Sequence, residues 1–257
     1  MRLGQIKWHG GAITAAIFNH TSARPIPDYT LCELISRAEK LGASLAEVAE
    51  EFSIPKPVAA EPLIPLQPRE VWAAAPGDRR PRVYLKGTAR VCVGPGQTIG
   101  IHPDSQFTAP GAEIGVVLGA RGRVLGYTLA NDISAWDTEG EDPLYLGQSK
   151  TFSASCALGP VMVTADEIGD PAELSISCTI TRDGATIFSG EICGGQFADR
   201  LADTIQFLMR ANPVPPGSVL LTGAGLAVGE KTALEAGDSV TIRAEQIGEL
   251  TNRAAMV

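Results

Sequence analysis

The chain has 257 residues, of which 44% are hydrophobic, so it is long enough to bury one sizeable core with or without a small appended domain. Its formal net charge of -8 opposes nonspecific binding to nucleic acid and to anionic membranes, so the expected partner is a small-molecule substrate or another protein. No run approaches the roughly 20 apolar residues that cross a bilayer, and residues 1–7 lack the apolar run of a signal peptide, so we expect a cytoplasmic protein.

The first part of the chain is expected to form a small α/β domain. Residues 3–18 indicate a strand hairpin, and two short helices follow it. Thr30 with Glu33, and Ser44 with Glu47, fit the capping box, in which a hydroxyl caps a free amide and the glutamate reaches back. These two pairs predict where the helices begin. The first helix should bury one face, formed by Leu31, Leu34, Ile35 and Ala38.

A proline-rich segment separates this domain from the rest of the chain. Five prolines fall within residues 55–68, and because each fixes φ and removes an amide donor, regular structure is not expected there. We place a domain boundary in this segment. The result is an N-terminal domain over residues 1–60 and a second domain over residues 61–257.

The second domain is dominated by predicted strands. Asp183 and Gly184 tolerate positive φ and predict a tight hairpin turn. One helix is expected from Phe197 to Met209, where apolar residues fall at helical spacing, and Asn212 before a proline ends it. The strands are expected at residues 82–86, 113–118, 124–130, 161–164, 174–181, 186–188, 219–222 and 239–245. This pattern predicts a β-rich α+β fold with one clear helix.

Cysteine and histidine do not suggest a metal or triad site. The three histidines are scattered, so neither a histidine-rich metal site nor a Ser-His-Asp triad is supplied. The cysteines are odd in number and contain no CxxC pair, so we expect reduced, packed thiols. They are Cys32, Cys92, Cys156, Cys178 and Cys193.

Several motifs together resemble those of the fumarylacetoacetate hydrolase superfamily. The central block comprises residues 126–134 (GYTLANDIS), 139–150 (EGEDPLYLGQSK) and 156–160 (CALGP). Its EGEDPLYL run is similar to the branch of 2-keto-3-deoxy sugar-acid dehydratases, which act on arabinonate and xylonate derivatives. Further matching blocks are residues 84–89 (YLKGTA), 219–223 (VLLTG) and 247–253 (IGELTNR). The resemblance covers roughly residues 65–253.

This resemblance implies a fold, an assembly and a cofactor. The fold would be a mixed β-roll of the fumarylacetoacetate hydrolase type with a small N-terminal α/β domain, and the protein would be a homodimer. A Mg²⁺ or Mn²⁺ ion would polarise a 2-keto acid and stabilise the enolate formed when the adjacent carbon loses a proton. The matching metal ligands are Glu113 and Asp132, whereas the position of the first family glutamate is Gly111. Glu139 or Glu141 could replace that ligand.

The resemblance also assigns substrate-handling residues. Lys150 matches the family lysine that contacts substrate or transfers protons, with Glu113 and Asp132 as further catalytic groups. The predicted substrate-binding residues are Lys86, Trp136, Gln148 and Thr222. The structural alternatives are a surface lysine at a strand start for Lys150, a snorkelling lysine for Lys86, core packing for Trp136 and solvated carboxylates for Glu113 and Asp132.

The spacing of Glu113 and Asp132 does not by itself bring them together. In a simple hairpin turning at residues 119–122, both would lie on one face but about 13 Å apart along the strands, at roughly 3.3 Å per residue. Their convergence is implied by the resemblance alone.

Four departures from the family pattern fall at the matched site. Gly111 replaces a glutamate, Trp136 replaces an arginine, Ala224 replaces a threonine, and the chain between Trp72 and Lys86 is much shorter than in the dehydratases. An indole offers apolar area where the arginine offered charge. These changes favour a repurposed pocket with a more apolar substrate.

Three functions follow as alternatives. The first is a metal-dependent lyase that removes water from a 2-keto-3-deoxy acid. The second is a cyclase, isomerase, decarboxylase or hydrolase of specialised metabolism, acting on a polarised carbonyl without a metal. The third is a non-catalytic binding module. Fold alone does not decide among them, because function belongs to the site.

Overall fold

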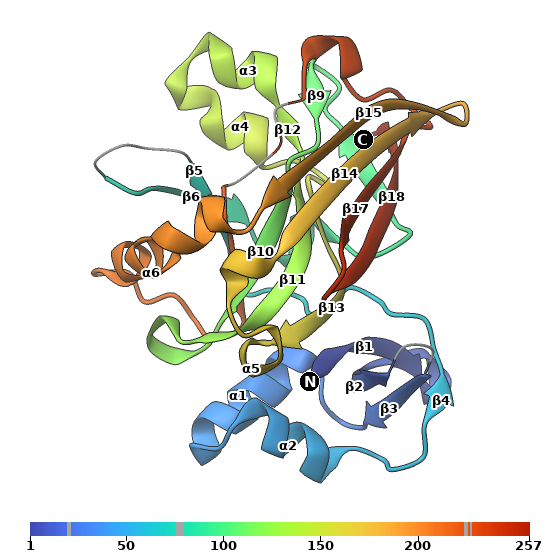
Figure 1. Ribbon diagram of the computed structural model, residues 1–257, viewed down its shortest axis with the longest axis vertical. Helices are drawn as coiled ribbons and strands as arrows, with labels where there is room; N and C mark the ends of the chain where they lie inside the picture. Colours follow the sequence, from blue (N-terminus) through green and yellow to red (C-terminus); the bar gives the residue numbers. More distant parts are fainter. Residues whose placement is uncertain (20–21, 76–79, 224–225, 227) are drawn as a thin grey trace.

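The computed structural model describes residues 1–19, 22–75, 80–223, 226 and 228–257. Across these residues the strands form an 11-stranded sheet, a five-stranded sheet and a two-stranded pair, and the helices are short apart from three. The predicted α+β class, rich in strands, is confirmed (Figure 1).

The N-terminal part begins with the predicted hairpin. Strand β1 (Arg2–Trp8) pairs antiparallel with β2 (Ala12–Asn19), and β3 (Ser22–Ile26) extends the pair. Helices α1 (Leu31–Leu41) and α2 (Leu45–Phe52) follow and pack beside these strands at one end of the molecule (Figure 1).

Both predicted capping boxes are present. The Thr30 hydroxyl accepts a hydrogen bond from the Glu33 amide, and the Ser44 hydroxyl accepts one from the Glu47 amide. Each glutamate carboxylate in turn accepts the backbone amide of its capping residue, at 2.8 Å for Thr30 and 2.9 Å for Ser44. The predicted apolar face of α1 is buried, as expected.

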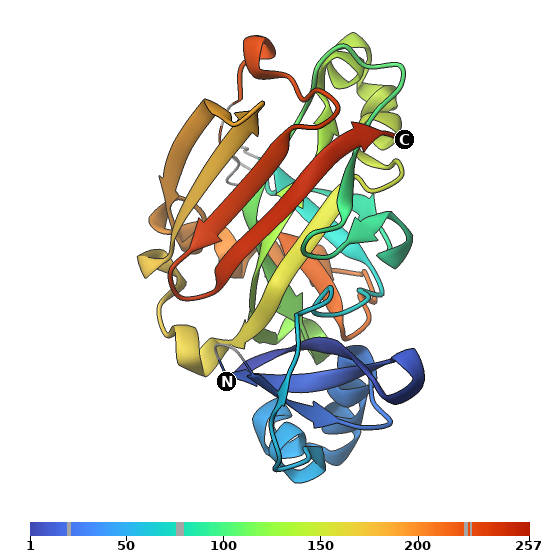
Figure 2. The same ribbon diagram turned by 90° about the vertical axis from the view of Figure 1, so that its right-hand side faces the viewer.

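The N-terminal strands continue the large sheet. Within the proline-rich segment the only regular element is the two-residue strand β4 (Val58–Ala59), which lies beside β3. At the other side, β1 pairs with β13 through Leu3 and Met162. The buried Gln5 side chain donates to the Ile64 carbonyl at 2.9 Å, so the proline-rich segment is also bound to β1. Figure 2 shows the N-terminal part attached beneath the larger body.

The large sheet runs from β1 through the central strands of the molecule. Most neighbouring strands are antiparallel, but β16 and β5 are parallel, as are β13 and β7. In sheet order after β1, the strands are β13 (Cys156–Thr164), β11 (Val124–Asp132), β10 (Ala112–Leu118), β16 (Ser218–Leu221), β5 (Val71–Ala75) and β6 (Arg82–Gly87), with β7 (Cys92–Val93) beside β13.

The five-stranded sheet packs against one face of the large sheet (Figure 2). Its strands are β15 (Ala185–Cys193), β14 (Ser175–Arg182), β17 (Ser239–Ala244), β18 (Gly248–Met256) and β8 (Thr98–Ile101). Asp183 and Gly184 turn between β14 and β15 with φ of 50° and 80°, which confirms the predicted hairpin. The small pair is β9 (Thr108–Ala109) and β12 (Ser134–Ala135).

Strand β10 separates two hydrophobic cores. Ile114 and Val116 face the core shared with the five-stranded sheet, whereas Val117 faces a second core that also contains α1 and α2 residues. Both faces of this strand are buried, because successive side chains of a strand point to opposite sides. A strand with both faces buried is a rigid place to mount a functional side chain.

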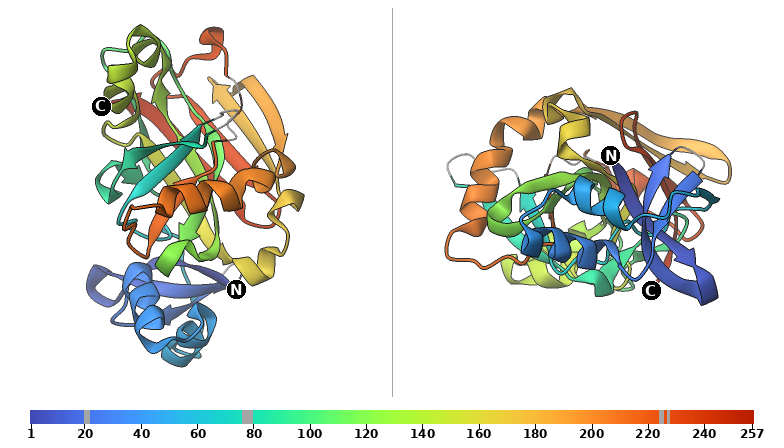
Figure 3. Two further views of the ribbon diagram at one scale, coloured as in Figure 1. Left: turned by 90° about the vertical axis from the view of Figure 1, so that its left-hand side faces the viewer. Right: turned by 90° about the horizontal axis from the view of Figure 1, so that it is seen from below.

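The helices differ partly from the prediction. Helix α6 (Gly195–Met209) is the predicted one and lies across the large sheet (Figure 3). Helices α3 (Trp136–Glu141), α4 (Leu146–Lys150) and α5 (Ala165–Ile168) were not predicted, because helices of four to six residues do not repeat an apolar face. The 3-10 helices are η1 (His9–Gly11), η2 (Ala89–Val91), η3 (Ala120–Gly122), η4 (Pro143–Tyr145), η5 (Pro171–Glu173) and η6 (Glu230–Thr232).

Some strands also exceed their predicted bounds. Strand β13 starts at Cys156 instead of residue 161, and β15 is longer than the expected 186–188. Strands β5, β8 and β18 were not predicted as strands; β18 carries few β-branched residues and is held by neighbours on both sides.

The five cysteines are all free thiols, as predicted. Cys32, Cys156 and Cys178 are buried, and Cys92 is half-buried. Cys193 is exposed at the end of the edge strand β15, so the expectation of packing is wrong for this residue. Among the described helices, none is both long enough and apolar enough to cross a bilayer.

Candidate active site

Strands β6 and β11 meet at the site although three strands separate them in sheet order. The Tyr84 hydroxyl, from β6, donates to Asp132 Oδ2 at 2.8 Å, and Lys86 Nζ, two residues later on the same face, lies 2.7 Å from Asp132 Oδ1. These contacts span β10, β16 and β5, so the sheet must curl until its edge faces its middle. The curl is the expected β-roll.

The register of β10 and β11 brings Glu113 close to Asp132. Glu113 lies opposite Ala130, two residues from Asp132, because the pairing shifts between Val117 and Leu118 near the turn. A diagonal pair of this kind is roughly 7 Å apart, compared with about 13 Å for the simple hairpin. The irregular turn therefore supplies the convergence that the strand spacing did not predict.

The backbone amide of Gly223 holds the Glu113 side chain near the start of β10. Its Oε2 atom accepts the Gly223 amide at 2.7 Å, and the side chain is only 5% exposed. Gly223 has φ of +71°, and a Cβ there would lie 2.3 Å from the Ala74 carbonyl oxygen, so only glycine fits. Glu113 is thus not a solvated turn carboxylate, and neither is the buried Asp132.

Lys150 lies at the end of α4 and not at a strand start. It is 5% exposed, donates to Ser134 Oγ at 2.8 Å and lies 3.0 Å from Glu139 Oε2. Its ammonium also faces the Trp136 ring, 4.5 Å from the centroid, and the Tyr84 ring at 5.7 Å. The surface alternative for Lys150 is therefore wrong.

Lys86 is fully buried, with 0% exposure. Besides Asp132, its ammonium donates to the Ile133 carbonyl at 2.7 Å and faces the Phe152 ring at 5.7 Å. It neither snorkels to solvent nor reaches open space where a substrate could lie. In this arrangement its ammonium faces protein groups, and contact of Lys86 with substrate stays a prediction.

The remaining predicted residues differ in placement. Trp136, the first residue of α3, is 45% exposed and covers Lys150, which rules out simple core packing. The Thr222 hydroxyl accepts the Ile114 amide at 3.3 Å, so it is engaged with β10. Gln148 is exposed on α4 and makes no hydrogen bond to the described site residues. Ala224 lies outside the described residues, as do residues 76–79 of the shortened segment.

The pKa values of the two buried carboxyl groups, Glu113 and Asp132, are shifted in opposite directions. Burial, reinforced by the negative charge of Asp132, raises the pKa of Glu113 to about 8. Burial also opposes ionisation of Asp132, but the ammonium groups of Lys86 and Lys150 outweigh it and hold the Asp132 pKa below its usual value. Burial and then Asp132 raise the pKa of Tyr84 far above that of a free phenol. At neutral pH, Glu113 and Tyr84 carry protons and Asp132 does not.

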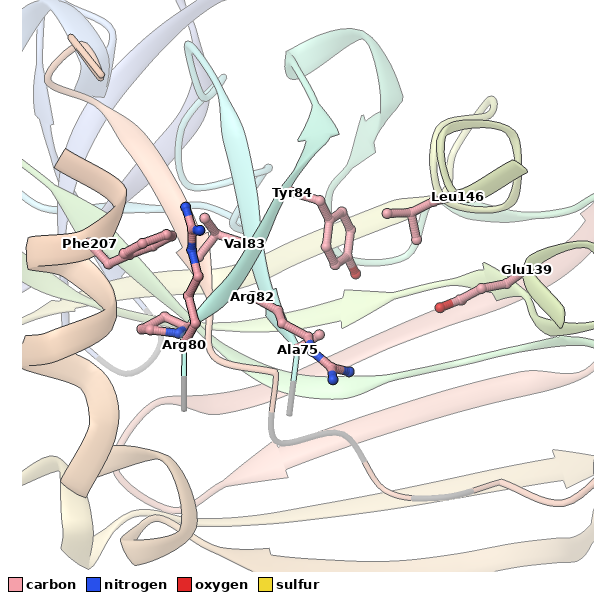
Figure 4. Close-up of a pocket in the computed structure, with 9 residues that line it drawn as sticks. Ala75, Arg80, Arg82, Val83, Tyr84, Glu139, Leu146 and Phe207 are labelled. Carbon is pink, nitrogen blue, oxygen red and sulfur yellow. The ribbon is translucent and has the colours of Figure 1, made fainter. Parts of the chain in front are cut away.

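A pocket of about 780 Å³ opens beside this cluster (Figure 4). The Tyr84 hydroxyl and the Glu139 carboxylate point toward the same space, and at the far side the Arg80 guanidinium lies 5.0 Å from the centroid of the Phe207 ring. The lining residues are Ala75, Arg80, Pro81, Arg82, Val83, Tyr84, Glu139, Leu146 and Phe207. Tyr84 and Glu139 therefore stand together in the pocket, Arg80 and Arg82 add positive charge to its wall, and the other lining residues are apolar.

The arrangement around Asp132 does not fit the predicted Mg²⁺ or Mn²⁺ ion. Lys86 and Tyr84 engage the two Asp132 oxygens, the Gly223 amide engages Glu113, and Gly111 supplies no carboxylate. A Cβ at Gly111 would lie 2.8 Å from the Asp132 carbonyl oxygen, so a glutamate at this position would require the backbone to shift. In the described part of the chain, no group of three His, Cys, Asp or Glu side chains could hold a metal. Glu139, the proposed replacement ligand, is paired with Lys150 instead.

The family profile described as fumarylacetoacetate (FAA) hydrolase, C-terminal, matches residues 67–255. The chain belongs to the fumarylacetoacetate hydrolase family. This membership agrees with the resemblance of its motifs and with its curled sheet.

Two relatives within the family are dehydratases by name. The chain is 42% identical over 171 residues to 2-dehydro-3-deoxy-D-arabinonate dehydratase of Saccharolobus solfataricus, covering 66% of this chain and 57% of the relative. It is 39% identical over 178 residues to a probable 2-keto-3-deoxyxylonate dehydratase of Haloferax volcanii, covering 69% of this chain and 61% of the relative. The matches thus span about three fifths of the relatives' lengths.

A solved structure extends the similarity to the whole fold. The structure of 2-keto-3-deoxy-D-arabinonate dehydratase complexed with magnesium and 2,5-dioxopentanoate matches with a TM-score of 0.83 and 30% identity, over 100% of this chain and 99% of that chain. The N-terminal elements therefore share the family arrangement as well.

Two residues of the cluster, Tyr84 and Ser134, were missed as functional candidates from sequence, and Glu139 was considered only as a replacement metal ligand. Tyr84 stands two positions before Lys86, so strand alternation could have placed both on one face. Ser134, and the pairing of Glu139 with Lys150, gave no such signal, because both depend on how α3 and α4 fold over the end of the roll.

Proposed function

We propose that this family member is an enzyme that removes a proton beside the carbonyl of a 2-keto acid, and that water is then lost from a 2-keto-3-deoxy sugar acid. The observation that carries the proposal is the cluster of Lys150, Glu139 and Tyr84, in which Tyr84 and Glu139 line the pocket and Lys150 lies beside them. The dehydratase names of the two relatives supply the substrate class.

The chain's own residues suit each step of this elimination. The Lys150 ammonium donates to the keto oxygen of the substrate and stabilises the negative charge that develops there as the proton leaves. Glu139, which borders the pocket, accepts that proton. Glu113 carries a proton at neutral pH and is suited to donate one to the departing hydroxyl group, while Asp132 orients Tyr84.

A second candidate rests on the apolar character of the pocket. Trp136 is largely exposed over Lys150, and Val83, Leu146 and Phe207 line the walls. These surfaces favour a substrate with an apolar portion, for which the same enolate chemistry would give isomerisation or decarboxylation instead of loss of water. A non-catalytic binding module is the third alternative.

The test follows hydrogen exchange and water loss together. The protein is incubated in D₂O with 2-keto-3-deoxypentonate, and proton NMR measures deuterium uptake beside the keto group and formation of 2,5-dioxopentanoate. We expect both signals. Deuterium uptake without the product would favour the second candidate, and neither signal with any 2-keto acid tested would contradict enzymatic enolisation. The matched control is Lys40→Met, which changes an exposed lysine on α1.

We also propose that the protein is a cytoplasmic homodimer. The dimer is implied by the family resemblance, and the free thiols suit a reducing compartment. Sedimentation equilibrium tests the dimer, which requires twice the mass of the 26.9 kDa chain. Fractionation of cells that contain the native protein tests the compartment.

A further inference from the structure

We propose that the Lys86 ammonium occupies the place of a divalent cation on Asp132, so that the site binds no divalent metal and works without one. The catalytic part of this inference rests on the proposed function. The binding part does not, because it concerns only what Asp132 holds.

The first support is the coordination of Lys86. Its ammonium is fully buried and lies within 2.7 Å of both Asp132 Oδ1 and the Ile133 carbonyl oxygen. Oxygen atoms of a carboxylate and a backbone carbonyl are also the ligands that hard cations prefer. A buried positive charge persists only when paired, so Lys86 and Asp132 stabilise each other as a unit.

The second support is the balance of charge. Asp132 is paired with Lys86, and Glu139 is paired with Lys150, so each of these two carboxylates already faces one ammonium. A divalent ion beside Asp132 would lie close to Lys86 in a poorly solvated space, where repulsion between like charges is strong. With Gly111 at the position of the first family ligand, Glu113 is the one remaining carboxyl group of the matched ligand set beside Asp132, and its Oε2 atom is engaged by the Gly223 amide.

The third support is a division of roles between the two lysines. Lys86 is closed off from the pocket, whereas Lys150 lies beside the pocket residues Tyr84 and Glu139. The Trp136 ring and the Ser134 hydroxyl hold the Lys150 ammonium in place. Trp136 stands at the position where the family has an arginine. Lys86 therefore neutralises and positions Asp132, and Lys150 supplies the positive charge that touches substrate.

The first experiment measures metal binding and chemistry on the same wild-type preparation. Chelator-stripped protein is titrated with Mg²⁺ and with Mn²⁺ by calorimetry, and deuterium exchange of the 2-keto acid is measured with and without excess chelator. We expect no saturable binding at millimolar metal and an unchanged exchange rate. A saturable site that disappears in Asp132→Asn would overturn the inference. A protein without exchange in any condition would contradict the proposed function, while its titration would still decide the binding question.

The second experiment removes the lysine charge. Lys86→Met keeps the chain length but frees Asp132 Oδ1, so we expect a saturable Mn²⁺ isotherm that the wild type lacks. Lys56→Met, at an exposed lysine, is the matched control and should bind no more metal than wild type. Circular dichroism checks folding, and Lys86→Gln replaces Lys86→Met if the latter does not fold. Absence of Mn²⁺ binding in a folded Lys86 variant would show that Lys86 is not what excludes the metal.

Discussion

At the scale of single residues, the site is defined by which groups face each carboxylate. Asp132 contacts the Tyr84 hydroxyl and the Lys86 ammonium, which lie on one face of β6. Glu113, two positions away across the strand pair, faces a backbone amide. Two carboxyl groups in different surroundings therefore have pKa values shifted in opposite directions, which separates an acid from a base.

The role assigned to Lys150 predicts a large loss of activity. Lys150→Met removes the charge that would stabilise the enolate, and we expect the deuterium-exchange rate to fall about 10²- to 10³-fold with little change in substrate binding. Lys150→Arg keeps the charge but not the compact ammonium, so it should recover only part of the rate. Equal rates for wild type and Lys150→Met would exclude Lys150 from the chemistry.

The raised pKa of Glu113 predicts how stability depends on pH. In the folded protein this pKa is about 8, against the ordinary value of 4.5, so between these values the folded state binds the extra proton. The contribution of Glu113 to stability is complete below pH 4.5 and is lost as the pH rises toward 8, with a slope of at most about 1.4 kcal/mol per pH unit.

Glu113→Gln tests this dependence, because the amide keeps the size of the side chain and cannot ionise. Urea unfolding at several pH values should show a flatter decline of the unfolding free energy for the variant than for wild type. Parallel declines in the two proteins would mean that Glu113 does not carry a raised pKa.

At the scale of elements, local capping and irregular turns have different consequences. The capping boxes at Thr30 and Ser44 are complete within four residues each, so the starts of α1 and α2 need no tertiary contact to be specified. The shift between Val117 and Leu118 instead acts at a distance, because it sets which residue of β11 faces Glu113. One irregularity near the turn thus decides the geometry of the site at the other end of the strands.

The α2 cap predicts a modest loss of stability. Ser44→Ala removes the hydroxyl that accepts the Glu47 amide, and we expect the free energy of unfolding to fall by about 1 kcal/mol. Ser44→Asp is the matched control, since aspartate also caps a helix and should retain most of that stability. Chemical denaturation measures both, and a loss as large for Ser44→Asp as for Ser44→Ala would contradict the capping role.

At the scale of the whole molecule, the N-terminal part and the rest are joined through the sheet and the second core. Strand β1 pairs with β13, and Glu39 of α1 binds Arg123 beside the β10–β11 turn at 2.9 Å. Cys32 Sγ lies 3.0 Å from the carbonyl oxygen of Gln67, near the end of the proline-rich segment. The boundary at residue 60 remains a proposal, and these contacts favour unfolding of both parts together.

Leu3 tests this coupling. Leu3 is fully buried on β1, so Leu3→Ala should lower the unfolding free energy by about 2–5 kcal/mol while leaving a single transition by circular dichroism. Ile13→Ala on the neighbouring strand is the matched control, because Ile13 is 43% exposed and should cost no more than about 0.5 kcal/mol. Two separate transitions in Leu3→Ala would instead support independent domains.

The sequence by itself determined what depends on neighbours in the chain. The helix starts at Thr30 and Ser44, the first hairpin, the turn at Asp183 and Gly184, and the apolar repeat of α6 could be predicted, because each signal is contained in a few consecutive residues. The family motifs also selected Glu113, Asp132 and Lys150 as members of one site. Short helices and strands without a clear repeat could not be predicted in this way.

Only the tertiary structure decided which groups those residues face. Lys86 and Tyr84 meet Asp132 because the sheet curls across three intervening strands, and no local pattern encodes that closure. The curl places an ammonium on the carboxylate that the motifs assign to a metal. Burial then fixes that pairing, since a desolvated charge is stable only beside a partner of opposite sign.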